Sequence, residues 1–333
     1  MRTRKLALAV VATLAIASVV AYGTASAVVY DKLSRVSGDC PPSWIANDPT
    51  SFSLIESEGG PVKGHEGFDT APYLMPAPET VTIPSRDPGI DVSGWYIAAE
   101  TRDAPTVIVV HGLTACKHDH AVLLPAGMLH RNGFAVLLID LRDHGDSTFE
   151  DGRYAGGTEE YRDVLGAWDW LQAKKGVPAN RIGLLGISLG AATVLIATGH
   201  EPRVAATWED SSYADLPSMI RNELTRSGYP TFLENGAGLV AKVMSGDDIT
   251  SYSPQDGVSQ LAGRPIFITH GDQDERIDVR YGHALVATAE AAGSTPQSWF
   301  VAGSGHTQAM VDHPAEYEHR LVDFFAGTIG EAD

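Results

Sequence analysis

The sequence predicts an α/β fold in which helices cover both faces of a mostly parallel sheet. Short apolar runs recur from residue 79 onward, and most lack the alternation of a strand that is exposed on one face. Patterns typical of helices lie between the runs, and this alternation indicates a doubly wound sheet. The chain has 333 residues, of which 44% are hydrophobic, so it is long enough to bury a large core.

Residues 1–30 are predicted to be a membrane anchor or an export signal. Arg2, Arg4 and Lys5 precede an uncharged stretch from Leu6 to Tyr30. A helix of this length can cross a bilayer core roughly 30 Å thick, and the basic start places the N-terminus inside. Ala25-Ser26-Ala27 resembles a signal-peptidase site, but the apolar run is longer than in most cleaved signals. We therefore expect a single anchor at the cell membrane with an extracytoplasmic body, and a secreted protein is the alternative.

The remaining elements are predicted in chain order. Residues 31–78 are rich in Gly, Pro and Asp and show little periodicity, so we expect a stalk or a wrapping segment. The main domain, residues 79–333, opens with an antiparallel pair of strands. The predicted strands are Val81–Ile83, Val92–Ala98, Val107–Val110, Ala135–Ile139, Ile182–Leu185, Val204–Thr207, Ile266–Ile268 and Ser298–Val301. The predicted helices are Ala121–Arg131, Glu159–Lys174, Leu189–Gly199, Val279–Ala292 and Ala315–Phe325.

One connection in the main domain is too long for an ordinary crossover. Residues 211–263 hold two helical patterns, near Asp215–Arg226 and Thr231–Met244. Long insertions in compact domains often form lids, so a lid is expected here.

Charge and cysteine content narrow the classes of partner. Acidic residues outnumber basic ones 42 to 24, and the formal charge is −18, which argues against nucleic acid as a partner. The two cysteines, Cys40 and Cys116, cannot make a disulfide framework or a cysteine-only zinc site. In an oxidising compartment they could pair with each other and pin the segment 31–78 to the main domain, although sequence does not show their separation.

A serine nucleophile is predicted at Ser188, within Gly186-Ile187-Ser188-Leu189-Gly190. An apolar strand precedes this motif and a helix of small residues follows it, which is the context of a nucleophile elbow. Glycines are needed there because the turn is strained and crowded. The alternative interpretation is a Gly-rich helix start that Ser188 caps.

Oxyanion donors are predicted from two loops. The backbone N–H of Leu189 follows the nucleophile, and the N–H of Leu113 lies in the loop after the strand Val107–Val110. Acyl transfer needs such donors because negative charge develops on the carbonyl oxygen. His111 lies beside this loop, and we expect it to order the loop rather than act as the base.

The acid and the base come from two later loops. The run from Ile266 ends in His270-Gly271-Asp272-Gln273-Asp274, so Asp274 and Asp272 are candidates for the acid, and Asp210 is a third. The base is predicted to be His306, within Gly303-Ser304-Gly305-His306. The chain order Ser, Asp, His is the order of one hydrolase architecture.

With these motifs the sequence resembles the α/β-hydrolase superfamily over roughly residues 79–327, and more narrowly its serine-aminopeptidase-like and dienelactone-hydrolase-like branches. The matching pieces are His111-Gly112, Asp140-Leu141-Arg142-Asp143-His144-Gly145-Asp146-Ser147, the elbow, His270-Gly271-Asp272-Gln273-Asp274 and Gly305-His306. Many relatives carry glycine where this chain has Asp143. The resemblance implies Asp274 as the triad acid. It also implies a small helical cap, inserted before the strand that carries the acid.

These observations predict a serine hydrolase that cleaves small-molecule carboxylic esters through Ser188, His306 and Asp274 and an acyl-enzyme intermediate. No metal or organic cofactor is required. A peptidase or amidase with the same residues is one alternative, and a non-catalytic cell-surface binding protein on a hydrolase scaffold is another. We expect the cap to control substrate choice. The residues available to line its pocket are Leu216, Met219, Ile220 and Leu224 on one face of the first helical pattern, and Phe232, Leu233, Leu239 and Val243 on the second. The sequence carries no signal for the oligomeric state.

Overall fold

The computed structural model describes residues 2–245 and 249–330, so three residues of the predicted cap and the last three of the chain lie outside the described part. The described residues form two compact units. We call residues 36–215 and 252–330 the catalytic unit. The other unit combines the N-terminal helix with the inserted segment 216–251, and we call that segment the cap.

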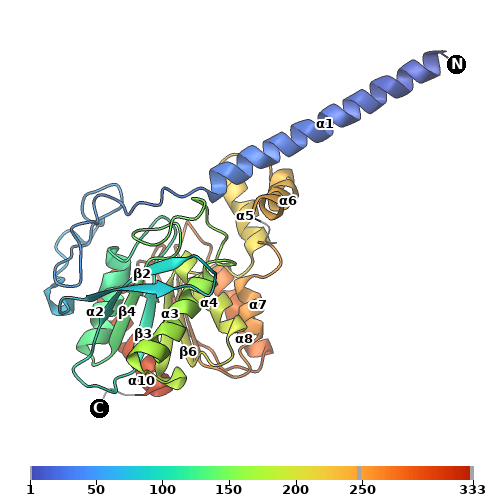
Figure 1. Cartoon of the computed structure of the whole chain (residues 1–333). Helices are drawn as coiled ribbons and strands as arrows, with labels where there is room; N and C mark the ends of the chain where they lie inside the picture. Colours follow the sequence, from blue (N-terminus) through green and yellow to red (C-terminus); the bar gives the residue numbers. More distant parts are fainter. Residues whose placement is uncertain (1, 246–248, 331–333) are drawn as a thin grey trace. The chain divides into compact units, whose positions relative to one another are not determined.

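The catalytic unit is built on an eight-stranded sheet (Figure 1). Its spatial order is β1-β2-β4-β3-β5-β6-β7-β8. The strands are β1 (Glu79–Pro84), β2 (Asp91–Ile97), β3 (Thr106–Val110), β4 (Ala135–Ile139), β5 (Ile182–Ile187), β6 (Ala206–Asp210), β7 (Ile266–Gly271) and β8 (Gln297–Val301). Strand β2 pairs antiparallel with both β1 and β4, whereas the pairs from β4 to β8 are parallel. The predicted mostly parallel sheet is confirmed.

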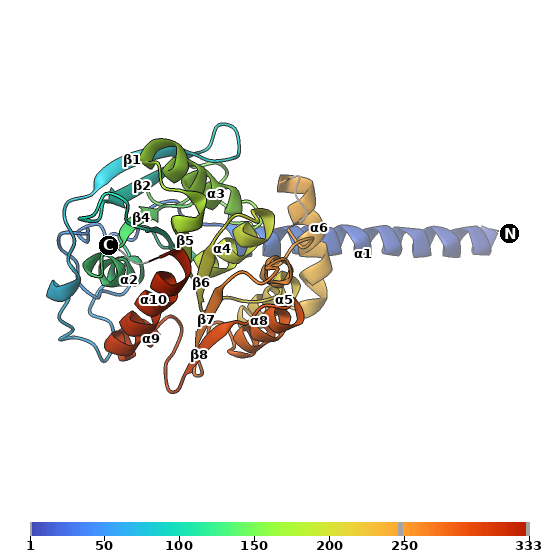
Figure 2. The same ribbon diagram turned by 90° about the horizontal axis from the view of Figure 1, so that it is seen from below.

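Helices pack on both faces of this sheet (Figure 2). One face carries α2 (His120–Arg131), α9 (Ala309–Asp312) and α10 (Pro314–Ile329). The other carries α3 (Tyr161–Trp170), α4 (Leu189–His200), α7 (Pro254–Ser259) and α8 (Arg280–Ala291). Successive residues of a strand point to opposite faces, so Val107 and Val109 of β3 join the core under α2 and α10. Ile108 and Val110 join the core under α3 and α4.

Most predicted elements differ from the observed ones by one or a few residues at their ends, and the largest differences are in three elements. A strand was expected at Val204–Thr207, but β6 runs from Ala206 to Asp210. It ends in Glu209 and Asp210, two buried acidic residues that an apolar pattern does not reveal. The helix expected over Glu159–Lys174 begins at Tyr161 and changes into a π-helical turn, η2 (Leu171–Lys175). The helix expected from Ala315 runs on to Ile329. Short helices with little periodicity were not predicted: α7, α9, η1 (Ala71–Tyr73) and η3 (Ala179–Arg181).

Residues 36–78 wrap around the catalytic unit (Figure 1). Phe52, Leu54, Val62 and Met75 are buried in the same core as α2 and α10, so the segment covers that face, mainly with turns and irregular backbone. A disulfide joins Cys40 to Cys116 across a sequence separation of 76, with the two Cα atoms 5.6 Å apart. The bond fixes the start of the wrapping segment, residues 36–78, beside the loop that follows β3.

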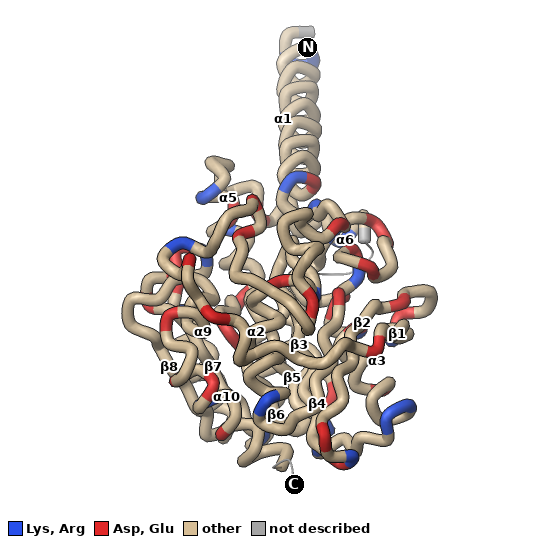
Figure 3. Tube along the Cα trace, turned by 90° about the vertical axis from the view of Figure 1, so that its left-hand side faces the viewer, with Lys and Arg blue, Asp and Glu red and all other residues tan. Residues whose placement is uncertain are grey.

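The other unit contains α1 (Arg2–Ser34), α5 (Leu216–Arg226), η4 (Thr231–Leu233) and α6 (Glu234–Ser245). Helix α1 is long and apolar enough to cross a membrane, and Figure 3 shows no charged residue between its two ends. Its most apolar part is exposed. Near its C-terminal end, Val29 and Tyr30 pack against Leu224 of α5 and Ala237 of α6. The helix is compatible with either a signal or an anchor.

Replacing both cysteines, Cys40→Ser with Cys116→Ser, should lower the free energy of unfolding by about 2–4 kcal/mol. Without the disulfide, the unfolded chain is no longer held in a closed loop and its conformational entropy is higher. Urea denaturation of the protein, followed by tryptophan fluorescence, measures the loss of stability. The parent protein under reducing conditions is the control and should match the variant. An unchanged midpoint in both would show that the disulfide does not constrain the unfolded chain.

Candidate active site

Ser188 stands on a strained turn between β5 and α4. Its backbone has φ +55° and ψ −114°, a conformation that costs energy for any residue with a side chain. The turn is crowded on both sides. A β-carbon at Gly186 would collide with Gly190 and Ala191, and one at Gly190 would collide with the carbonyl oxygens of Val110 and His111. Both glycines are therefore required where the motif places them.

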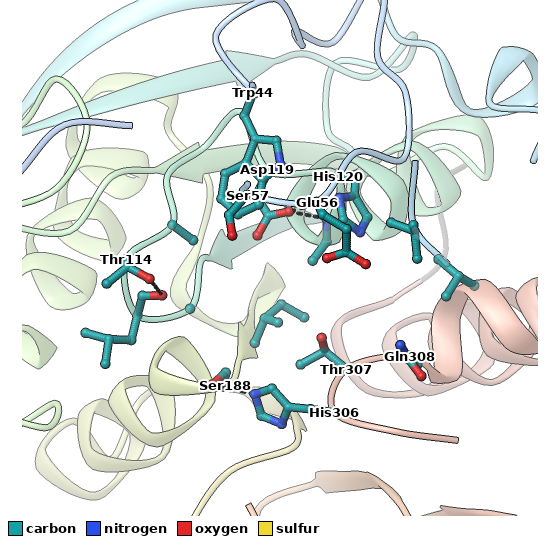
Figure 4. Close-up of a pocket in the computed structure, with 17 residues that line it drawn as sticks. Trp44, Glu56, Ser57, Thr114, Asp119, His120, Ser188, His306, Thr307 and Gln308 are labelled. Carbon is teal, nitrogen blue, oxygen red and sulfur yellow. Dashed lines mark hydrogen bonds and ion pairs between the residues drawn. The ribbon is translucent and has the colours of Figure 1, made fainter. Parts of the chain in front are cut away.

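The structure brings Ser188, His306 and Asp274 together. His306 Nε2 lies 2.9 Å from Ser188 Oγ, and His306 Nδ1 lies 2.7 Å from Asp274 Oδ2. Figure 4 shows Ser188 and His306 side by side at the edge of a pocket. The three residues come from loops that follow β5, β7 and β8, so the carboxyl ends of three parallel strands position them.

The two other candidate acids have different partners. Asp272 Oδ1 accepts a hydrogen bond from the backbone N–H of Gly303. Asp210 is fully buried and accepts hydrogen bonds from Tyr317 Oη at 2.9 Å and Ser211 Oγ at 2.8 Å. Only Asp274, of these three carboxylates, contacts the His306 ring in the described structure.

The predicted oxyanion donors flank the nucleophile. Leu189 is the first residue of α4. Gly112 lies against Ser188, since a β-carbon there would be 3.3 Å from that of the serine, and Leu113 follows it at the pocket. His111 orders this loop, because its ring bonds the Gly112 carbonyl at 2.7 Å and accepts from the N–H of Leu141 at 3.0 Å. Burial lowers the pKa of His111 to about 4, so its ring is neutral.

A second histidine, which sequence analysis did not single out, contacts the acid. His270 is fully buried, and its Nε2 lies 2.7 Å from the Ile277 carbonyl and 3.3 Å from Asp274 Oδ2. Burial alone would lower the pKa of His270, but its hydrogen bonds to Asp274 and to the Ile277 carbonyl outweigh burial and raise that pKa. Burial opposes ionisation of Asp274 as well, yet hydrogen bonds from His270 and His306 hold its pKa below the usual range. Asp274 therefore stays ionised beside His306.

Behind this pair, Glu209 is buried on β6. The N–H of Ser212 donates to Glu209 Oε2 at 2.9 Å, while Glu209 Oε1 and His270 Nδ1 have no hydrogen-bond partner among residues 2–245 and 249–330. Burial raises the pKa of Glu209 to about 8. The carboxyl group is therefore mainly protonated at neutral pH.

The pocket at Ser188 has a volume of about 290 Å³. One wall comes from the wrapping segment, which contributes Trp44, Glu56, Ser57 and Val62, and Figure 4 shows the first three across the pocket from Ser188. Sequence analysis did not predict this wall. The cysteine pair was the one signal for it, because the disulfide places Cys40 next to the loop that borders the pocket.

Polar groups of the loop before α2 complete the pocket. Asp119 caps that helix by accepting from the N–H of Ala121 at 3.0 Å, and burial raises its pKa. Glu56 faces the same space, so two carboxyl groups lie opposite Ser188. Within the described part of the chain, no cluster of three or more His, Cys, Asp or Glu residues could hold a metal ion.

Comparisons with known proteins agree with this architecture. The model of the prolyl oligopeptidase family matches residues 124–332. An uncharacterised 31.7 kDa protein from the traX-finO intergenic region of Escherichia coli is 30% identical over 131 residues, which are 39% of this chain and 44% of that protein. The matched region thus spans less than half of that relative. Human protein ABHD12B is 29% identical over 260 residues, 72% of this chain and 64% of its own length.

Among solved structures, the esterase Pf2001 of Pyrococcus furiosus superimposes with a TM-score of 0.62 at 20% identity. The superposition covers 79% of this chain and 97% of that one. This likeness confirms the α/β-hydrolase fold that the motifs predicted.

Glu209→Gln should flatten the dependence of stability on pH. The pKa of Glu209 is about 8 in the folded chain against a reference of 4.5, so the folded protein keeps a proton that the unfolded chain releases. Stability then falls as pH rises from about 4.5 to about 8, and glutamine removes this contribution. Urea midpoints at pH 5 and pH 8 measure the slope for both proteins. Equal slopes would show that Glu209 is ionised in the folded protein.

Proposed function

This chain belongs to the prolyl oligopeptidase family, and we propose that it is a serine hydrolase that cleaves small carboxylic esters with Ser188, His306 and Asp274 as its triad. The observation that carries the proposal is the continuous hydrogen-bonded array from Ser188 Oγ through His306 to Asp274, set on a strained turn beside a pocket. A serine hydroxyl is a weak nucleophile until an oriented base takes its proton.

The proposed reaction proceeds in two halves. Ser188 Oγ attacks the ester carbonyl carbon while His306 Nε2 takes the hydroxyl proton, and the N–H groups of Leu113 and Leu189 stabilise the oxyanion. The intermediate expels the alcohol, which receives the proton from His306. A water molecule then gives a proton to His306 and attacks the acyl-enzyme. Ser188 Oγ leaves with that proton, and the carboxylic acid is released. Asp274 stays ionised and stabilises the imidazolium throughout.

A peptidase or amidase is the second candidate, and two observations favour it. The family is named for a peptidase, and Glu56 and Asp119 line the pocket opposite Ser188. An ionised carboxylate there would attract the ammonium group of an aminoacyl substrate. Esters remain the first proposal because an alcohol is a better leaving group than an amine, and the same triad cleaves esters more easily.

We further propose that α1 is retained as an anchor at the cell membrane, with the catalytic unit on the outer side. Cleavage after Ala27 would separate Ser26 from Val29 and Tyr30. Ser26 is fully buried and lies against Gly236 of the cap, so both sides of the cleavage point pack on the same cap core. Loss of the part of α1 that precedes the cleavage point would uncover apolar and small side chains of the cap. N-terminal sequencing of the mature protein beginning at Val28 would overturn this proposal.

Purified full-length protein should hydrolyse short acyl esters faster than aminoacyl amides, and Ser188→Ala should lower both rates by several orders of magnitude. The variant should also lose labelling by a fluorophosphonate, because no oxygen remains to attack phosphorus. Initial rates on matched ester and amide panels measure the preference. Faster amide cleavage would favour the peptidase alternative, and undiminished labelling of the variant would place the nucleophile elsewhere.

Asp274→Asn should reduce kcat strongly, by roughly 10⁴ if it favours the wrong histidine tautomer as in a studied triad. Asp272→Asn and Asp210→Asn are matched controls, since they change neighbouring carboxylates that do not contact His306. Their kcat should fall much less. The comparison requires thermal denaturation of each variant to show that it is folded. A larger loss in either control would assign the acid to that residue.

A further inference from the structure

The cap carries a group of apolar side chains that its own core does not bury. Among the described residues outside α1, seven large hydrophobic side chains are exposed, and four of them are Phe232 in η4 and Leu239, Val243 and Met244 in α6. Single exposed apolar residues are ordinary, but a group on one short segment marks a contact surface. We call these four residues the apolar cap face.

The cap is packed directly on α1. Leu233, Ala237 and Ala241 form a common core with Val29 and Tyr30. Gly236 sits so close to Tyr22 and Ser26 that a side chain at this position would have no room. The position of the cap along α1 is therefore set by contacts from Tyr22 onward, whereas residues 3–21, which precede these contacts, are exposed.

The apolar cap face begins where the cap first meets α1. The ring of Phe232 stacks on that of Tyr22, with centroids 6.2 Å apart, and Tyr22 Oη donates to the Phe232 carbonyl at 3.1 Å. Leu239 and Val243 follow Gly236 at spacings of three and seven residues, so the three lie on one side of α6. Leu239 and Val243 are 63% and 77% exposed. The face therefore continues outward from the point at which Gly236 touches α1.

The length of α1 sets the level of this face relative to a bilayer. A hydrocarbon core about 30 Å thick holds about 20 helical residues at 1.5 Å each. Counted from Leu6, the first residue after the basic group, that span ends near Ala25. The contacts of the cap with α1 start three residues earlier, at Tyr22. If α1 spans the membrane, the start of the cap lies at the outer boundary of the hydrocarbon and not in bulk water.

We propose that the apolar cap face rests in the outer lipid surface of the membrane that α1 spans. The inference rests on the proposed anchor and names a second, peripheral contact with the same bilayer. The partner is the acyl and glycerol region of phospholipids, which accepts exposed Phe, Leu, Val and Met side chains. Tyr22 and Phe232 lie at the depth where aromatic side chains are favoured. The chain carries a formal charge of −18, so the contact is apolar and does not require anionic lipid.

The test uses full-length protein in phosphatidylcholine vesicles, with one introduced cysteine at a time carrying a nitroxide label. The native cysteines are bonded to each other and do not react. The sites are Leu239→Cys on the cap face, Ala12→Cys within the apolar part of α1, and Phe149→Cys, an apolar residue of the catalytic unit with similar exposure, 60%. Collision rates with oxygen, which concentrates in hydrocarbon, and with an uncharged nickel complex, which concentrates in water, report the depth of each label. Retained ester hydrolysis shows that each labelled protein is folded.

We expect the oxygen-to-nickel ratio at Leu239→Cys to exceed that at Phe149→Cys several-fold and to lie below that at Ala12→Cys. Equal ratios at the cap and at Phe149→Cys, with Ala12→Cys in hydrocarbon, would overturn the cap inference and leave the anchor intact. A water-exposed label at Ala12→Cys would refute the anchor and the inference together. A cap label shielded from both reagents, with spin–spin broadening between copies, would show that a second copy covers the face.

Discussion

The backbone at Ser188 is the constraint on which the rest of the site depends. Its turn, with a positive φ, exists only where β5, α4 and the end of β3 approach closely enough that Gly186 and Gly190 have no room for a side chain. The neighbouring strand holds the turn as well, because the Ser188 N–H donates to the Asp210 carbonyl at 2.8 Å. The sheet order and the glycine positions together aim the hydroxyl at His306. The strain is balanced by a core that packs both faces of the same strands.

The fold and the main chemistry were predictable because they leave local patterns. Buried parallel strands appear as apolar runs, and the elbow, the acid loop and the base loop each follow such a run. The choice of acid was harder. Residue types alone left Asp210, Asp272 and Asp274 open, since all three follow strand ends, and the family resemblance implied Asp274. The structure separates them by what each oxygen contacts, which depends on loop geometry that spacing does not encode.

The pocket wall was not predictable for a physical reason. Trp44 and Glu56 lie in a segment without periodicity, and their position depends on contacts with residues far along the chain. Trp44 Nε1 donates to the Ile55 carbonyl at 2.6 Å, and its ring packs with Ala115 and Cys116. Buried polar groups such as Glu209 and His270 were missed for a related reason. Their burial follows from the packing of β6 against β7, and a charged residue in sequence gives no sign that it is dehydrated.

The disulfide between Cys40 and Cys116 also bears on whether an anchored form of this protein could be shed from its membrane. A protease that cut the chain anywhere between these two cysteines would leave both fragments covalently joined. A cut that released the protein would therefore have to lie ahead of the disulfide, in residues 35–39, between the end of α1 and Cys40. That stretch is held by backbone pairing, because the Val36 N–H donates to the Gly152 carbonyl at 2.9 Å and Gly38 bridges to His144. An anchored form would therefore withstand proteolytic trimming of its wrapping segment and act only where its membrane is.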